Sequence, residues 1–520
     1  MPPKLQLVKY ALDVHGEYFR GRLAGEKHHQ NGDQAAREIR VTVRHEVETG
    51  RGSGLQTRDQ PDVTDAALNS VCFRFQFCGH VFQLVAQFNN VSVAVFPGVQ
   101  ELEILDQIVN RCCFHRPRPF LPLYYTPLTR LANAMSIQLG YCTNVHAGAD
   151  LDQTRANLQQ HALAVKRLVS PQTPLGIGLW LSAAASGTLR RGGQLDEFQA
   201  WLQEAGLVPF TFNGFPFGDF HQRVVKHRVY QPTWCDRARL DYTLDLIAIQ
   251  HQLLPPGREG SISTLPLQWG HPPPSGSDLQ RCAENLAEIA EQLDYLRQET
   301  GRLIYVCLEP EPGCVLQRSA DVVDFFEHFL LPGRDERCLR RHIRVCHDVC
   351  HAAVMFEDQA DAVARYVAAG IAIGKVQVSS ALVLNLDELA AADRRPALEQ
   401  LRGFHEDRYL HQTCVQATAS GAPSFFEDLP AALQTAADDR PQQGQWRVHF
   451  HVPIHVGRFG RLSTSQSDIA ACLQAVRRCP ELRHFEIETY AWTVLPEPLR
   501  QATLAEGIAA EIRWFQRLVS

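Results

Sequence analysis

The chain has 520 residues, of which 45% are hydrophobic and 21% are charged, and its formal net charge is −6. This composition is typical of a soluble globular protein and excludes a generally disordered or fibrous chain. The acidic balance gives no basic field for nucleic acid, so we expect no nucleic-acid partner.

Membrane and export signals are not apparent in the sequence. No run reaches the ~18 apolar residues that a membrane helix needs. The first residues, MPPKLQLVKYALDVHGEYF, contain neither an apolar core nor a small-residue cleavage site. The 15 cysteines are scattered, and Cys112 and Cys113 are adjacent. We therefore expect reduced thiols and a cytoplasmic protein without a membrane partner.

Residues 1–134 differ in pattern from the rest of the chain. Helical periodicity is poor, and polar, breaker-rich text surrounds one strand-like run, Phe73 to Val95. A proline-rich stretch from Pro117 to Pro127 then predicts a linker. We expect a poorly structured extension or a genuine small domain. Because Met135 opens a clean strand, a mis-called start, with translation beginning at Met135, is the alternative, and an intact-mass measurement decides between them.

From residue 135 to residue 520, strand-like and helix-like stretches alternate. The strand-like runs are Leu139–His146, Leu175–Ser182, Leu207–Phe212, Ser261–Leu267, Leu303–Glu309, Ile343–Asp348, Ile371–Ser379, Arg447–Pro453 and His484–Tyr490. The helical stretches are Asp152–Leu168, Leu195–Ala205, Arg237–Gln252, Ser277–Thr300, Ser319–Phe329, Gln359–Ala369, Ser465–Arg478 and Gln501–Leu518. This alternation predicts an α/β fold, a (β/α)₈ barrel.

One of the nine strand candidates is surplus to a barrel of eight. We expect it to belong to an insertion near Ser380–Gln445. An open, doubly wound sheet is the alternative fold, but no GxGxxG follows the first strand.

Carboxylates recur where the predicted barrel strands end. Glu309, Asp348 and Glu488 each follow a buried apolar run, where a carboxylate is costly unless it is paired or bound to a metal. Catalytic groups of such barrels lie at these strand ends. The strand ends therefore predict a divalent-metal site, with manganese, zinc or magnesium as the candidate ion.

Alternation along each strand leaves the choice of ligand open in three places. Glu311 competes with Glu309, and Glu486 shares a face with Glu488. His449 and His451 also share a face, so one would be a ligand and the other its supporting residue.

The segment Asp348-Val349-Cys350-His351 resembles the D-x-x-H signature of the xylose-isomerase-like barrel superfamily. That superfamily includes sugar isomerases, epimerases and endonuclease IV. The resemblance implies metal ligands at Glu309, Asp348 and Glu488, with His351 as a companion histidine. The strand-seven histidine of the superfamily has two candidates in this chain, Gln377 and His451.

A closer resemblance covers nearly all of residues 135–520. GYCTNVHAG, FTFNGFPFGDFH, STLPLQWG, LEPEPG, CHDVCHAAV, KVQVSSAL, RYLHQT, HFHVP and EIETYAWTVLP occur in this order. Together they resemble the EboE family of metabolite-traffic proteins, which occur in clusters with enzymes of secondary metabolism. The resemblance implies a small-molecule metabolite and association with other proteins of such a cluster.

Three functions follow from these features. The first is a metal-dependent isomerase or epimerase of a sugar-like or hydroxy-carbonyl compound. In it, Glu309 and Glu488 move protons, and His351 binds a hydroxyl or supports the ligands. The second is a metabolite-binding or carrier protein without turnover, since Gln377 would be a poor ligand. The third is phosphodiester hydrolysis of endonuclease IV type, which the negative charge disfavours.

Overall fold

The computed structural model describes residues 40–44, 70–77, 80–87 and 137–520, with gaps at 436–442, 497–498, 500 and 502. The chain divides into two compact units, Met1–Leu128 and Thr129–Ser520. In the first unit, β1 (Arg40–Arg44), β2 (Ser70–Phe77) and β3 (His80–Gln87) form an antiparallel sheet with β2 in the middle. The predicted single run from Phe73 is therefore two strands as far as Gln87, and its remainder to Val95 lies outside the described residues.

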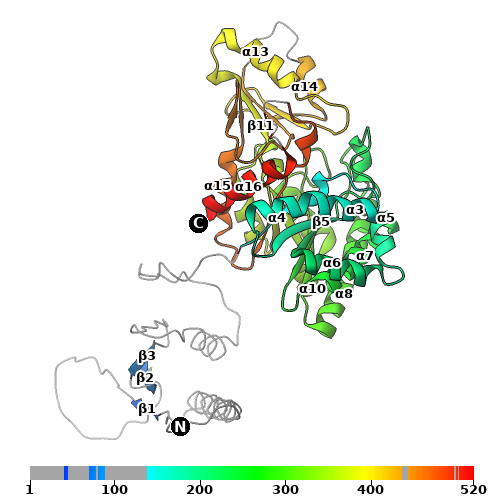
Figure 1. Ribbon diagram of the computed structural model, residues 1–520. Coiled ribbons are helices and arrows are strands. Elements are labelled where there is room, and N and C mark those ends of the chain that lie inside the picture. The colour runs from blue at the N-terminus through cyan, green and yellow to red at the C-terminus, as the bar shows by residue number, and fades with distance from the viewer. Residues whose placement is uncertain are drawn as a thin grey trace, which may run out of the picture. The chain divides into compact units, whose positions relative to one another are not determined.

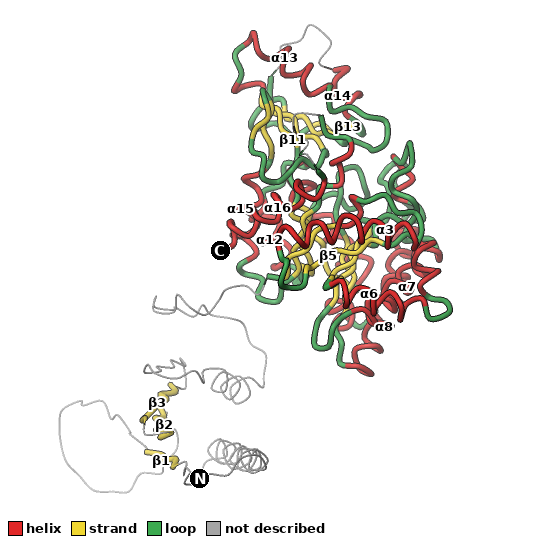
Figure 2. Tube along the Cα trace, viewed as in Figure 1, coloured by secondary structure: helices red, strands yellow, loops and turns green. Residues whose placement is uncertain are grey.

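The second unit is built on a closed barrel of eight parallel strands (Figures 1 and 2). The strands, in barrel order, are β4 (Gln138–Cys142), β5 (Leu175–Trp180), β6 (Leu207–Asn213), β7 (Gly260–Thr264), β8 (Ile304–Leu308), β9 (Ile343–Asp348), β10 (Ile373–Val378) and β17 (His484–Ile487). The last strand, β17, closes the barrel, because it pairs in parallel with both β10 and β4. The predicted (β/α)₈ barrel is confirmed.

Helices follow the strands and cover the outside of the barrel. They are α3 (Leu151–Asn157), α4 (Leu163–Val169), α5 (Ala183–Leu189), α6 (Gln194–Ala205), α7 (Arg237–Leu253), α8 (Gly276–Thr300), α9 (Ser319–Phe325), α10 (Glu336–His342), α11 (Val349–Val354), α12 (Gln359–Ala368), α15 (Gln466–Val476) and α16 (Leu504–Val519). The longest of them, α8, has capped ends. It begins at a capping box formed by Ser275 and Asp278, and it ends at Gly301, whose φ is 71°. None of the helices among the described residues is long and apolar enough to cross a membrane.

An insertion separates the last two barrel strands. It contains an antiparallel sheet of β11 (Leu382–Asn385), β12 (Thr413–Gln416), β13 (Ser424–Phe426), β14 (Gln445–Val448), β15 (Arg458–Phe459) and β16 (Leu462–Thr464), with α13 (Ala391–Arg402) and α14 (Leu429–Thr435). Figure 1 shows this sheet and its two helices beyond one end of the barrel.

The surplus strand candidate, Arg447–Pro453, belongs to this insertion. Only its first residues are a strand, β14, which pairs antiparallel with β11 and β12. The following residues return to the barrel, where Val452 N donates to Ser380 O at 3.0 Å. Arg447–Pro453 is therefore not a barrel strand. The insertion also extends past Gln445, as far as β16.

Candidate metal centre

Three carboxylates predicted from the strand ends come together at one end of the barrel. Asp348 is the last residue of β9, and Glu309 and Glu488 directly follow β8 and β17. One ligand oxygen from each lies within 4.8 Å of the other two. Their exposed fractions are 3%, 2% and 5% for Glu309, Asp348 and Glu488. Three acidic groups therefore share a buried site.

Neutral donors satisfy only part of this acidic cluster. Asn144 Nδ2 and Asn213 Nδ2 donate to Glu488 Oε1 at 2.7 and 3.2 Å. Ser379 Oγ donates to Asp348 Oδ1 at 2.8 Å. Glu309 Oε2 and Asp348 Oδ2 are buried and have no hydrogen-bond partner. Two buried carboxylate oxygens thus lack the partner that such groups normally need.

The electrostatics of the cluster follow from burial and mutual repulsion. Burial raises the pKa of Glu309 well above its usual range, and the neighbouring Glu488 and Asp348 raise it further. The pKa of Glu488 is raised to about 8, again mainly by burial. Burial also disfavours ionised Asp348, but His351, His451 and hydrogen bonds overcome it and lower its pKa. A divalent cation would neutralise this repulsion.

His451 places an imidazole nitrogen beside Asp348. Its Nδ1 donates to the carbonyl oxygen of Glu488 at 2.8 Å, which leaves the lone pair on Nε2. His451 Nε2 is buried, lacks a hydrogen-bond partner, and lies 4.0 Å from Asp348 Oδ2. Burial lowers the pKa of His451 to about 4, so the ring is neutral at pH 7, as a metal ligand requires.

Gln377, the other strand-seven candidate, lies inside the barrel wall. It is the register partner of Asp348 on β9 and of Glu486 on β17. Its exposed fraction is 0%, and both amide atoms lack hydrogen-bond partners. Gln377 does not line the cavity at the carboxylate cluster, whereas His451 does. Both candidates therefore neighbour Asp348, but only His451 borders the open space.

The choice between Glu486 and Glu488 has a clear electrostatic reason. Glu486 forms an ion pair with Lys375, and both side chains are fully buried in the barrel interior. A Cβ at Gly178 would clash with the Glu486 carboxylate, so the glycine makes room for it. Glu486 is thus neutralised by Lys375, and Glu488 remains for the cavity. Sequence reasoning missed Lys375, since a lysine in a strand is usually exposed.

A second group of potential ligands adjoins the first. His351 Nε2 and His449 Nε2 face each other at 3.2 Å. Both Nδ1 atoms already have acceptors, Pro310 O at 2.8 Å for His351 and Gln412 Oε1 at 2.7 Å for His449. A hydrogen bond between the two Nε2 atoms needs a proton on one of the rings, and a metal ion bound by both nitrogens is the alternative. Two nitrogens at about 2.0–2.1 Å from one zinc in tetrahedral geometry would be about 3.3 Å apart.

Glu311 belongs to this second group and not to the first. Its carboxylate lies within 4.8 Å of His351 and His449 ligand atoms. It accepts hydrogen bonds from Tyr230 Oη at 2.7 Å and Gln412 Nε2 at 2.9 Å. These bonds hold it in place beside His449, so Glu309 and Glu311 serve different clusters.

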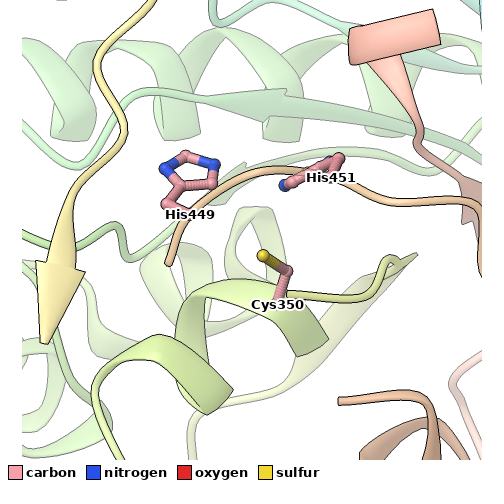
Figure 3. A group of neighbouring side chains, drawn as sticks. All are labelled: Cys350, His449 and His451. Carbon is pink, nitrogen blue, oxygen red and sulfur yellow. The ribbon is translucent and has the colours of Figure 1, made fainter. Parts of the chain in front are cut away.

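Cys350 extends the nitrogen-rich side of the centre. Its sulfur lies within 4.8 Å of ligand nitrogens of His449 and His451. In Figure 3, the thiol points from the start of α11 toward the segment that carries both histidines. The nearby His347 has a different partner: its Nε2 forms a hydrogen bond of 2.7 Å with Gln359 Oε1. His347 is therefore not part of the cluster.

A small cavity of about 70 Å³ opens onto both groups. Its acidic and imidazole lining consists of Glu309, Glu311, Glu488, His351, His449 and His451, and its aromatic lining of Phe215, Phe220, Tyr230, Tyr409 and Tyr490. Sequence reasoning had no signal for Tyr230, which lies in a short 3-10 helix, Lys226–Tyr230. Tyr409 and Gln412 lie in the string RYLHQT, but the resemblance assigned neither of them a role. The volume is that of a few water molecules, which suits a small ligand.

Comparisons with known proteins return structural similarity only. No protein-family model and no curated protein matches the chain. One similar structure is a probable 3-DHS dehydratase, AsbF, from Bacillus anthracis, with 12% identity, a TM-score of 0.36, and coverage of 73% of this chain and 99% of that one. The IolI protein with a bound zinc atom has 11% identity, a TM-score of 0.38, and coverage of 74% and 98%. A xylose isomerase domain protein from Planctomyces limnophilus has 12% identity, a TM-score of 0.37, and coverage of 74% and 98%.

Proposed function

We propose that this protein is a divalent-metal-dependent isomerase or epimerase of a small sugar-like or hydroxy-carbonyl compound. The observation that carries the proposal is a set of unpartnered buried ligand atoms. Glu309 Oε2 and His451 Nε2 belong to residues that line one cavity, and Asp348 Oδ2 lies 4.0 Å from His451 Nε2. Buried polar atoms without partners are rare unless an ion or water satisfies them. Carboxylate and imidazole donors together suit manganese or zinc, and carboxylates alone suit magnesium.

The ligand shell would consist of Glu309, Asp348, Glu488 and His451. A cation bound there supplies positive charge that holds substrate oxygens and polarises a carbonyl group. Asn144 and Asn213 orient the Glu488 carboxylate through their hydrogen bonds to Oε1. Ser379 and the backbone N–H of His351 orient Asp348 in the same way.

Proton transfer at carbon is assigned to the two glutamates. Glu309 and Glu488 come from strands β8 and β17 and approach the cavity from different sides of the barrel. One carboxylate accepts the proton next to the substrate carbonyl, and the other returns a proton. His351, which lines the same cavity, would bind a substrate hydroxyl. The aromatic residues of the lining form the apolar wall of the cavity.

The cavity's size supports a metabolite rather than a nucleic acid strand, and it therefore weighs against the endonuclease IV alternative. Of the aromatic residues near the strand ends, Phe215 lines the cavity, whereas Phe212 and Trp492 pack in the hydrophobic core. The EboE resemblance adds that the compound belongs to secondary metabolism and that the protein works with other proteins of its cluster. A cytoplasmic location is proposed separately, from the scattered cysteines. These points are part of the proposal.

The test combines metal analysis with isotope exchange. The purified protein, loaded in turn with Mn²⁺, Zn²⁺ and Mg²⁺, is expected to bind a stoichiometric ion and to exchange carbon-bound hydrogen of a ketose or aldose with D₂O. Stoichiometric metal without exchange in any of a broad panel of sugars would favour the carrier function. Failure to bind any of the three ions would overturn the proposal.

A further inference from the structure

The C-terminal helix α16 carries an acidic residue on its buried face. Glu511 lies between the core residues Ile508 and Phe515, and its exposed fraction is 0%. A carboxyl group in such a place is costly unless hydrogen bonds compensate for the loss of water. Its partners therefore tell what the residue does.

All three hydrogen-bond partners of Glu511 are donors from outside α16. Thr489 Oγ1 donates to Glu511 Oε1 at 2.6 Å, and the backbone N–H of Ile454 donates to the same oxygen at 3.0 Å. Trp492 Nε1 donates to Oε2 at 3.3 Å. Gly507, one turn earlier on α16, makes room for the Trp492 ring, since a Cβ there would clash with it.

These donors belong to the two segments that present metal-centre residues. Thr489 adjoins Glu488, and Ile454 lies three residues after His451. The two segments also touch on their inner side, where His451 Nδ1 donates to the Glu488 carbonyl oxygen. Glu511 thus joins, from the outer side, one segment of the barrel wall and one of the insertion.

We infer that Glu511 is a positioning residue for the metal centre, a role that rests on the proposed function. It fixes the backbone that carries Glu488 and the backbone that carries His451 relative to each other. The imidazole and the carboxylate are then held in place before a cation arrives. Partners outside the ligand shell of metal sites commonly change metal affinity by about 10–100-fold.

The test uses Glu511→Gln, which keeps the shape of the side chain but places an amide where three donors converge. We expect Mn²⁺ affinity to fall by about 10–100-fold, and the visible spectrum of the Co²⁺-loaded protein to change, because ligand angles change. Thr489→Val, which removes only the 2.6 Å bond, is expected to shift both readouts in the same direction by less.

Two controls separate positioning from stability. Glu506→Gln alters an exposed glutamate of the same helix, bonded to Thr503 at 2.9 Å, and is expected to change neither readout. Phe515→Leu lowers the melting temperature through lost packing against Phe485, and is expected to leave the Co²⁺ spectrum unchanged.

The outcomes distinguish this inference from the proposed function. Wild-type protein that binds neither Mn²⁺ nor Co²⁺ overturns both. Wild-type binding together with a Glu511→Gln variant that is less stable but has the wild-type Mn²⁺ affinity and Co²⁺ spectrum overturns the positioning role alone. A Phe515→Leu variant that alters the spectrum as much as Glu511→Gln would also overturn it, since general loosening of α16 would then suffice.

Discussion

The barrel and the insertion contribute different chemistry to one site. The barrel strands end in the carboxylates Glu309, Asp348 and Glu488, whereas the insertion brings the imidazoles of His449 and His451. Barrel strands are buried on both faces and end at a common edge, so their acids meet by topology. The imidazoles reach the same place only because the chain after β14 returns to the barrel. The three carboxylates thus come from the barrel, and the imidazoles of His449 and His451 come from the insertion.

The largest expected effect is on a barrel carboxylate. Glu488→Gln keeps the shape and one oxygen donor but removes the base, so D₂O exchange should fall on the order of 1,000-fold. Metal affinity should fall much less. Deuterium incorporation followed by NMR measures the rate, and Glu481→Gln at an exposed position is the control. If Glu488→Gln exchanged deuterium at the wild-type rate, the base would be Glu309 and not Glu488.

The ligand role of the barrel is tested most directly at Asp348. Asp348→Asn retains the volume but removes the charge, and Mn²⁺ affinity should fall by at least about 100-fold. Metal content and far-UV circular dichroism are measured together, and the fold should stay native. Asp407→Asn, whose side chain is 87% exposed in the wild-type protein, should bind metal normally. Unchanged occupancy in Asp348→Asn would remove Asp348 from the ligand shell.

The contribution of the insertion is sharpened by comparing His451→Ala with Gln377→Ala. Imidazole is the better ligand, and His451 Nε2 borders the cavity, so His451→Ala should lower Zn²⁺ affinity by about 10–100-fold. Gln377→Ala should lower it by less. Competition with a chromophoric chelator gives both constants. A larger loss of affinity in Gln377→Ala than in His451→Ala would make Gln377, and not His451, the metal ligand. Equal, negligible losses in both variants would exclude both residues as ligands.

The pH dependence of metal affinity is a smaller effect that distinguishes Glu488 of the barrel from His451 of the insertion. Burial raises the pKa of Glu488 to about 8, so a cation must displace a proton below that pH. His451, with a pKa of about 4, is already deprotonated. Mn²⁺ affinity should therefore rise by up to about tenfold per pH unit for each displaced proton as the pH approaches 8. Calorimetry in two buffers counts the protons.

Two variants assign those protons. Glu488→Gln should release fewer protons on binding Mn²⁺ than the wild-type protein, whereas His451→Ala should release as many. Affinity that does not change with pH over this range would mean that the carboxylates are already ionised in the metal-free protein.

The sequence was informative where local pattern and position agree. The predicted run Ile343–Asp348 matches β9 residue for residue, and the carboxyl ends of parallel strands must meet at one edge. The run Arg447–Pro453 begins with a strand of the insertion, as expected for a surplus candidate, but its pairing was left open, because alternating apolar residues predict a strand and not its partner. The ion pair of Lys375 with Glu486 depends on the distance between neighbouring strands, and no local pattern records it.

The position of the insertion in the chain has a consequence for the order of folding. β17 closes the barrel between β10 and β4, yet it is synthesised after the entire insertion. A nascent chain that ends before His484 has seven barrel strands, exposed edges on β10 and β4, and no Glu488 or Glu511. Pairing of β17 therefore closes a long loop late, which is entropically slow. The same event seals the sheet and assembles the proposed cation site, so metal binding would report completed barrel closure during refolding.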